Sequence, residues 1–169
     1  RPVGVFTVNE SAAQAARVVV QSNRTVVNGN SLTRLLFDDG KWWAELQTRL
    51  VVEQDNLDVM HLKVPSSCPG PFEIESNVPV TTETKAQQDG VHHLDVRVAT
   101  SVAKGKEFTL RLRTLLGPAG SSAAAVPDIE ITPFAGRRLI SVPKAVKSQL
   151  FGWTSAGTKP VNIPDEWRE

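Results

Sequence analysis

Residues 41–52 read Lys-Trp-Trp-Ala-Glu-Leu-Gln-Thr-Arg-Leu-Val-Val, the longest clean two-residue alternation in the chain. Successive side chains of a β-strand point to opposite faces, so this pattern predicts a strand with one buried and one wet face. The face expected to be buried carries Trp42, Ala44, Leu46, Thr48, Leu50 and Val52, and the other carries Trp43, Glu45, Gln47, Arg49 and Val51. Such a strand is typical of an antiparallel sheet that packs on one side.

Further alternating or β-branched runs surround this stretch. In one of them Leu94, Val96 and Val98 are expected to point inward and His93, Asp95 and Arg97 outward. Asn28-Gly29-Asn30 carries the Asn-Gly signal of a tight hairpin, since both central residues must tolerate positive φ. The other strand candidates are 3–8, 17–21, 24–27, 32–37, 57–64, 72–76, 78–85, 107–115, 129–131 and 138–142. Turn signals lie at 38–40, 87–90 and 103–106, and a proline-rich loop at 65–71.

The spacing of these segments predicts the fold class. About ten to twelve short strands with regular turn signals indicate an all-β protein, an antiparallel β-sandwich that is jelly-roll-like or immunoglobulin-like. At most one or two short helices are expected, at 10–16 and 144–150. Helix and strand do not alternate over long units, which disfavours an α/β fold.

A chain of 169 residues is expected to form one domain, 1–169. The small-residue stretch 117–126 is expected to be a mobile loop, and 144–169 a C-terminal tail that packs on the sandwich. The chain opens on Arg1-Pro2 without a Met or a leader-like segment, so we expect it to be a piece of a larger protein. No apolar run reaches the roughly 18 residues of a membrane span, and membrane insertion is not expected.

The charges are scattered and nearly balanced, with 19 Lys and Arg against 18 Asp and Glu. Nucleic-acid binding is therefore not expected. The single cysteine, Cys68, cannot form an internal disulfide, and no basic neighbour in the sequence lowers its pKa, so we interpret it as unreactive. Arg97, Arg111 and Arg113 could form a small positive stripe across neighbouring strands, although a solvated sheet face is the preferred interpretation.

No catalytic, cofactor or metal site is predicted. Among the three histidines, His93 shares a strand face with Asp95 and could supply two metal ligands, but solvent-facing polar residues are the favoured interpretation. Nucleophile-elbow and phosphate-loop motifs do not occur in the sequence. A pair of catalytic carboxylates stays open as a third alternative, because no spacing among the eighteen acidic residues singles two of them out.

The tryptophans are the functional lead, because exposed aromatic faces stack on sugar rings or anchor protein partners. Trp42 and Trp43 are adjacent and cannot both be buried by the same packing. The structural alternative places Trp42 in the core and Trp43 under the C-terminal tail, with Trp153 and Trp167 as the cover. The functional alternative makes Trp43, Trp153 and Trp167 ligand-binding residues.

One resemblance extends over the second two-thirds of the chain. It rests on Leu62-Lys63-Val64-Pro65, on the strands at 94–98 and 110–112, on Val126-Pro127-Asp128-Ile129, and on Arg138–Pro143 followed by Phe151–Thr154. This layout resembles β-sandwich modules of large multi-domain extracytoplasmic bacterial proteins of the planctomycete type. The resemblance implies an extracytoplasmic or cell-surface location and carries no functional residue.

Together these observations predict a non-catalytic structural or protein-interaction module of a larger secreted or surface protein. Its expected partners are other protein modules, to which edge strands are available for pairing. The alternative is a carbohydrate-binding module that holds polysaccharide through exposed tryptophans.

Overall fold

The computed structural model describes residues 24–117, 124–146, 149–150, 152–154, 157–162, 164 and 167. These residues form an all-β protein, as predicted. The described strands are β1 (Val26–Asp38), β2 (Lys41–Gln54), β3 (Asn56–Pro65), β4 (Glu73–Ser76), β5 (Val80–Gln88), β6 (Val91–Ala103), β7 (Glu107–Leu116), β8 (Glu130–Thr132), β9 (Ala135–Ser141), β10 (Ala145–Val146) and β11 (Gln149–Leu150).

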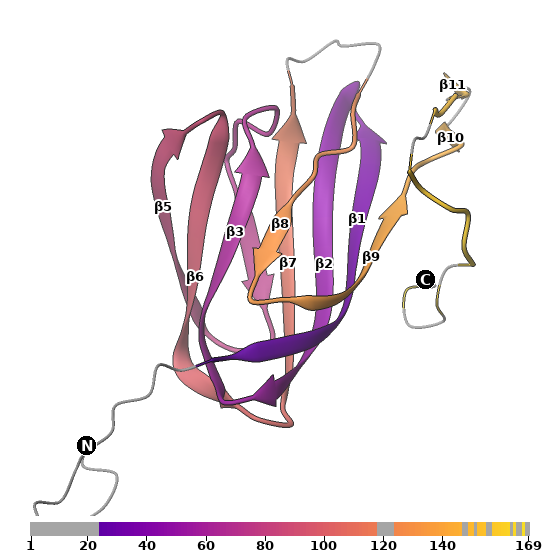
Figure 1. Ribbon diagram of the computed structural model, residues 1–169. Helices are drawn as coiled ribbons and strands as arrows, with labels where there is room; N and C mark the ends of the chain where they lie inside the picture. The colour runs from indigo at the N-terminus through magenta and orange to yellow at the C-terminus, as the bar shows by residue number, and fades with distance from the viewer. Residues whose placement is uncertain are drawn as a thin grey trace, which may run out of the picture.

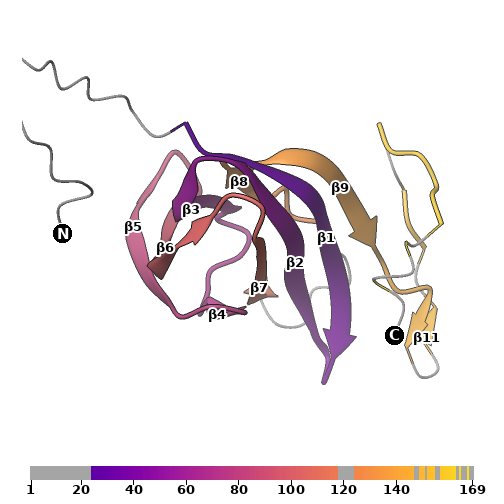
Figure 2. The ribbon, with the colours of Figure 1, turned by 90° about the horizontal axis from the view of Figure 1, so that it is seen from below.

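Two sheets pack face to face as a sandwich (Figure 1). One sheet has five strands in the order β4-β7-β2-β1-β9, and the other has four in the order β5-β6-β3-β8. Among the described strand pairs, β1 and β9 alone run parallel. The chain crosses between the sheets after β2, β3, β4, β6, β7 and β8, and the β4–β5 and β8–β9 crossings lie at opposite edges of the sandwich (Figure 2).

The core lies between the sheets and is centred on β2, which pairs with β1 on one side and β7 on the other. All six side chains of β2 that were expected to be buried are at most 5% exposed, which confirms the alternation. Burying a large aliphatic or aromatic side chain contributes about 1.5–3 kcal/mol. The core partners of β2 come from the facing strands and from β7: Leu57, Met60, Leu62, Val64, Leu94, Val96, Phe108, Leu110 and Leu112. The hydroxyl of Thr48 is satisfied within this core, because the amide of Leu110 donates to it at 3.0 Å.

The predicted hairpin at Asn28-Gly29-Asn30 is wrong, because β1 runs straight through these residues. Gly29 pairs with Leu50 of β2 and with Gly136 of β9. Its φ is +151°, and a Cβ there would lie 2.1 Å from the carbonyl oxygen of Arg49. A Cβ on Gly136 would in turn lie 2.1 Å from the carbonyl oxygen of Gly29. The glycines therefore permit close contact between three strands, and no turn forms there.

The predicted turns at 38–40, 87–90 and 103–106 are confirmed as tight turns between consecutive strands. The helix predicted at 144–150 is wrong in its described part, where β10 and β11 pair as a two-residue ladder. Each of these strands has only two residues, which is too few to show the two-residue alternation of a strand in the sequence. The segments predicted at 3–8, 10–16 and 17–21 lie outside the described residues, as do positions 118–123 of the predicted loop.

Substituting Gly29 with alanine should destabilise the fold strongly. The added methyl meets backbone atoms of β2, which cannot move without disturbing the ladder, so we expect a loss of about 2–4 kcal/mol in the free energy of unfolding. Urea unfolding followed by tryptophan fluorescence measures this loss. Gly152→Ala is the matched control, because a Cβ there meets nothing within 4 Å. Equal stability of the two variants would contradict the close contact of the strands.

Candidate functional site

The outer face of the five-stranded sheet, which points away from the four-stranded sheet, carries the candidate site. Residues that are paired across a ladder project to the same side of the sheet. The register therefore builds rows of side chains across this face: Arg34, Glu45 and Arg113; Leu32, Gln47 and Arg111; Arg137, Asn30, Arg49 and Thr109. Every position in these rows follows from the two-residue period of its strand.

A buried carboxylate organises the middle of the outer face. Glu45 was expected to be a wet residue, but it is only 2% exposed. Arg111 donates to its Oε2 from Nε at 2.9 Å and from Nη2 at 2.5 Å, and Gln47 donates to its Oε1 at 2.6 Å. The hydrogen bonds to Glu45 raise the pKa of Arg111 above its ordinary value, so this guanidinium stays charged. Glu45 and Arg111 thus form a fixed ion pair whose charges largely cancel. The two-residue alternation of β2 alone would predict that Glu45 faces solvent.

Trp43 lies on the outer face beside this unit, partly buried. The guanidinium carbon of Arg113 is 4.4 Å from its ring centroid, a cation–π contact from the neighbouring strand. The C-terminal tail was predicted as the cover of Trp43, but the described contact of this ring is with Arg113. One side of the Trp43 ring is therefore occupied.

Trp167 lies near the centre of the outer face and is 7% exposed. Arg34 donates to its carbonyl oxygen at 3.0 Å, and the guanidinium carbon of Arg49 is 5.9 Å from its ring centroid. Its indole nitrogen is buried without a hydrogen-bond partner in the part of the chain that the structure describes. These contacts fix one C-terminal residue against β1 and β2.

Trp153 lies elsewhere. Its ring packs edge-on against Trp42 of the core at 5.8 Å between centroids, and its indole nitrogen donates to the carbonyl of Pro143 at 2.6 Å. Of the three predicted ligand-binding tryptophans, the structure brings Trp43 and Trp167 to one face and leaves Trp153 against the core. Within the described residues these three rings make no contact with one another.

A groove of about 440 Å³ opens on the outer face, bounded by Trp167 at one wall and edge strand β4 at the other. We name it the Arg49 groove. Eight of its ten lining residues are polar or charged: Gln47, Thr48, Arg49, Glu75, Ser76, Asn77, Thr109 and Arg111, with Leu110 and Trp167 as the other two. Asn77 fixes its far end, because its Oδ1 accepts from the amide of Thr109 at 2.9 Å and its Nδ2 donates to the carbonyl of Glu107 at 3.2 Å.

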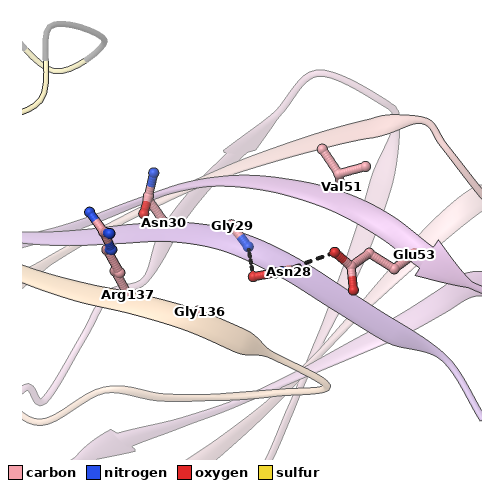
Figure 3. Close-up of a pocket in the computed structure, with 7 residues that line it drawn as sticks. All are labelled: Asn28, Gly29, Asn30, Val51, Glu53, Gly136 and Arg137. Carbon is pink, nitrogen blue, oxygen red and sulfur yellow. Dashed lines mark hydrogen bonds between the residues drawn. The ribbon is translucent and has the colours of Figure 1, made fainter.

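A second hollow, of about 340 Å³, lies over the two glycines (Figure 3). Gly29 and Gly136, which are paired across β1 and β9, both belong to its lining. Asn28, Asn30, Val51, Glu53 and Arg137 complete its lining, and Asn28 donates to Glu53 at 2.9 Å. Each hollow has one carboxylate in its lining, Glu75 or Glu53.

The outer face of the four-stranded sheet carries a different cluster, centred on Asp95. Asp95 was expected to be wet, but it is 3% exposed beneath its partners. Its carboxylate lies 2.8 Å from Lys85, 2.8 Å from His61 and 3.5 Å from Arg97. The hydrogen bonds from Lys85 and then His61 lower the pKa of Asp95 from 3.8 to about 2. His93, which the sequence left open as a second metal ligand, pairs across the ladder with Lys63 and Lys85.

Other sequence candidates also have defined positions. Arg97 belongs to β6 of the four-stranded sheet, whereas Arg111 and Arg113 belong to β7 of the other sheet, so the alternative of a three-arginine stripe across neighbouring strands does not occur. Cys68 is fully buried, and burial raises the pKa of its thiol to about 11, in agreement with an unreactive cysteine. Within the described ranges, no three His, Cys, Asp or Glu side chains gather as a metal site, and no helix is long and apolar enough to span a membrane.

Removing the Glu45 carboxylate should destabilise the protein. Glu45→Ala leaves Arg111 and Gln47 without their acceptor, so we expect the free energy of unfolding to fall by about 1–3 kcal/mol. Glu75→Ala is the control, because Glu75 also contacts Arg111 but its side chain is 75% exposed; its effect should stay within about 0.5 kcal/mol. Chemical denaturation of both variants measures the difference. If they behave alike, Glu45 does not organise the outer face.

Asp95 should stabilise the fold in a pH-dependent way. Its folded pKa lies below the unfolded value, so its contribution is present above about pH 4 and disappears as the pH falls through about 2. Asp95→Asn should therefore be less stable than the parent protein near neutral pH, by about 1–3 kcal/mol, and the gap should close in acid. Thermal unfolding across this pH range tests it. A gap that is independent of pH would show that the carboxylate charge is not the cause.

Comparisons with known proteins identify no family for this chain. The chain matches no known protein-family profile, and no curated protein sequence is significantly similar to it. Among solved structures, an M1 zinc metallopeptidase from Deinococcus radiodurans is similar over 57% of this chain and 21% of its own length, with 13% identity and a TM-score of 0.39. A two-domain M1 zinc metallopeptidase variant bound to L-tryptophan is similar over 57% and 22%, with 12% identity and a TM-score of 0.39.

A non-cellulosomal cohesin from the hyperthermophilic archaeon Archaeoglobus fulgidus is similar over 70% of this chain and 91% of its own length, with 10% identity and a TM-score of 0.35. The chain spans about a fifth of the length of the two metallopeptidases. At these scores the likeness is loose, and no residue role is transferred from any of these proteins. The chain is a β-sandwich module, and its function has to be argued from its own surface.

Proposed function

We propose that this chain is a non-catalytic protein-interaction module of a larger secreted or surface-associated protein, and that it binds its partner through the outer face of the five-stranded sheet. The observation that carries the proposal is the Arg49 groove. Tryptophan and arginine are the residues most enriched at the energetic centres of protein interfaces. The groove presents the exposed side chain of Arg49, which packs on the largely buried ring of Trp167, beside Arg111 and the polar residues of the lining.

The groove is held in shape before any partner arrives. Arg111 is fixed by Glu45, Asn77 is fixed by the backbone of β7, and Trp167 is fixed by Arg34. Side chains that are already ordered lose little conformational entropy when they bind, which favours affinity.

The carbohydrate alternative has less support from the same surface. Sugar rings stack on an open aromatic face. Arg113 lies over the ring of Trp43, Trp167 is 7% exposed, and Trp153 packs on Trp42. The third alternative, a hydrolase that uses a pair of carboxylates, requires two that face each other, whereas each of the two hollows described has one.

Two binding experiments test the proposal. Selection from a random 12-residue peptide display library tests protein binding, and a glycan array tests the carbohydrate alternative. We expect enriched peptides that bind the parent protein and lose binding to Arg49→Glu. Lys104→Glu, in the exposed turn between β6 and β7, is the control for the charge reversal and should bind as the parent does. Peptides that bind both variants equally, or a failure to enrich any peptide, would contradict the proposed surface. A glycan signal that Trp167→Ala abolishes would favour the carbohydrate alternative.

A further inference from the structure

The two sheets differ in how their surface cations are neutralised. On the four-stranded sheet, Lys63 pairs with Glu130 at 2.8 Å, Lys85 with Asp95 at 2.8 Å, and Arg97 with Asp95 at 3.5 Å. These cations are already paired with carboxylates of the same face. This face therefore offers little to a charged partner, because each new pair would first have to break an existing one.

On the five-stranded sheet, Arg49 and Arg137 have no carboxylate partner among the described residues. Both are exposed, and both belong to one row, because Asn30 pairs with Arg137 on one side and with Arg49 on the other. They sit two strands apart, which is about 10 Å. Figure 3 shows Asn30 and Arg137 on the same side of the ribbon. Two unneutralised guanidinium groups are thus held at a fixed spacing, with an amide between them.

From this arrangement we propose that the partner presents an acidic segment, which lies across β9, β1 and β2 with carboxylates on Arg137 and Arg49. The inference rests on the proposed function and names the chemistry of the partner. A guanidinium binds a carboxylate through two parallel hydrogen bonds, so each arginine can fix one acidic side chain. The Arg49 side chain also packs against the Trp167 ring. This contact reduces the conformational entropy that Arg49 loses when it binds a partner.

Neighbouring groups set the limits of the segment. Beyond the row lie Glu53, held by Asn28, and Glu75, near Arg111 at 3.5 Å. Glu53 lies on β2 to one side of the row, and Glu75 lies on β4 beyond the Arg49 end, so these carboxylates disfavour further acidic residues around Arg49. A protein segment can present two carboxylates at the spacing of the arginines without further negative charge, whereas a uniformly charged polysaccharide cannot.

The test is fluorescence anisotropy with a labelled Gly-Ser peptide that carries two Glu residues three positions apart, a spacing of about 10 Å in an extended chain, against the same peptide with Gln in place of Glu. We expect binding of the Glu peptide alone, weakened by salt. The double variant Arg49→Gln and Arg137→Gln should weaken binding at least about tenfold, equivalent to about 1.4 kcal/mol. Lys104→Gln and Lys106→Gln, both in the exposed β6–β7 turn, form a charge-matched control that should bind as the parent does.

Three outcomes would overturn the inference. One is a failure of the Glu peptide to bind, another is equal binding of the two peptides, and the third is full binding by the double variant. If library peptides of neutral composition still bind through the Arg49 groove in these cases, the proposed function stands without the acidic partner. Polygalacturonate that binds through the same arginines, when the Glu peptide does not, would make the surface an acidic-polysaccharide site and overturn both proposals.

Discussion

Apolar packing between the two sheets is the constraint on which the rest of the structure depends. β2 is paired on both sides and buries every second side chain from Trp42 to Val52, so its register fixes the positions of β1 and β7. A shift of one residue would turn this whole set toward water. The inner face therefore decides which residues of these strands point outward and which of them meet in a row.

The outer face of the five-stranded sheet follows from that constraint but has a second level of organisation. Glu45 points outward by its place in β2, yet Arg111, Gln47 and the surrounding side chains remove it from solvent. Burial of a carboxylate is tolerated because the charge is paired and its oxygens accept hydrogen bonds. The outer face of the four-stranded sheet uses the same device at Asp95, but there Lys85, His61 and Arg97 all converge on one carboxylate. The outer face of the four-stranded sheet thus pairs these cations with its own carboxylates. On the outer face of the five-stranded sheet, Arg49 and Arg137 stay available to a partner.

The sequence predicts the parts of this structure that depend on local period. The strand 41–52, the tight turns at Asp39-Gly40 and Lys104-Gly105, and the sandwich class all follow from alternation and turn chemistry. The hairpin at Asn28-Gly29-Asn30 does not, because glycine serves a turn and a close strand contact equally well. Only the partners of Gly29, the backbone of Arg49 and the distant Gly136, decide between the two.

The candidate site could be predicted only in part. The alternation puts Trp43, Glu45, Gln47 and Arg49 on one face, but it cannot show that Arg111 neutralises Glu45 or that Trp167 packs beside Arg49. Those contacts join residues more than sixty positions apart, and they depend on ladder register and on where the chain returns. Arg49 was the available signal, as an arginine at the centre of the most regular strand.

Amide chemical-shift mapping of the ¹⁵N-labelled protein during titration with a bound peptide tests the central claim most directly, because it locates binding without any substitution. The account predicts that the perturbed amides cluster along the row of Asn30, Arg49 and Thr109 and extend to Trp167. Perturbations confined to the four-stranded sheet around Asp95, or to the turns at the ends of the sandwich, would contradict it.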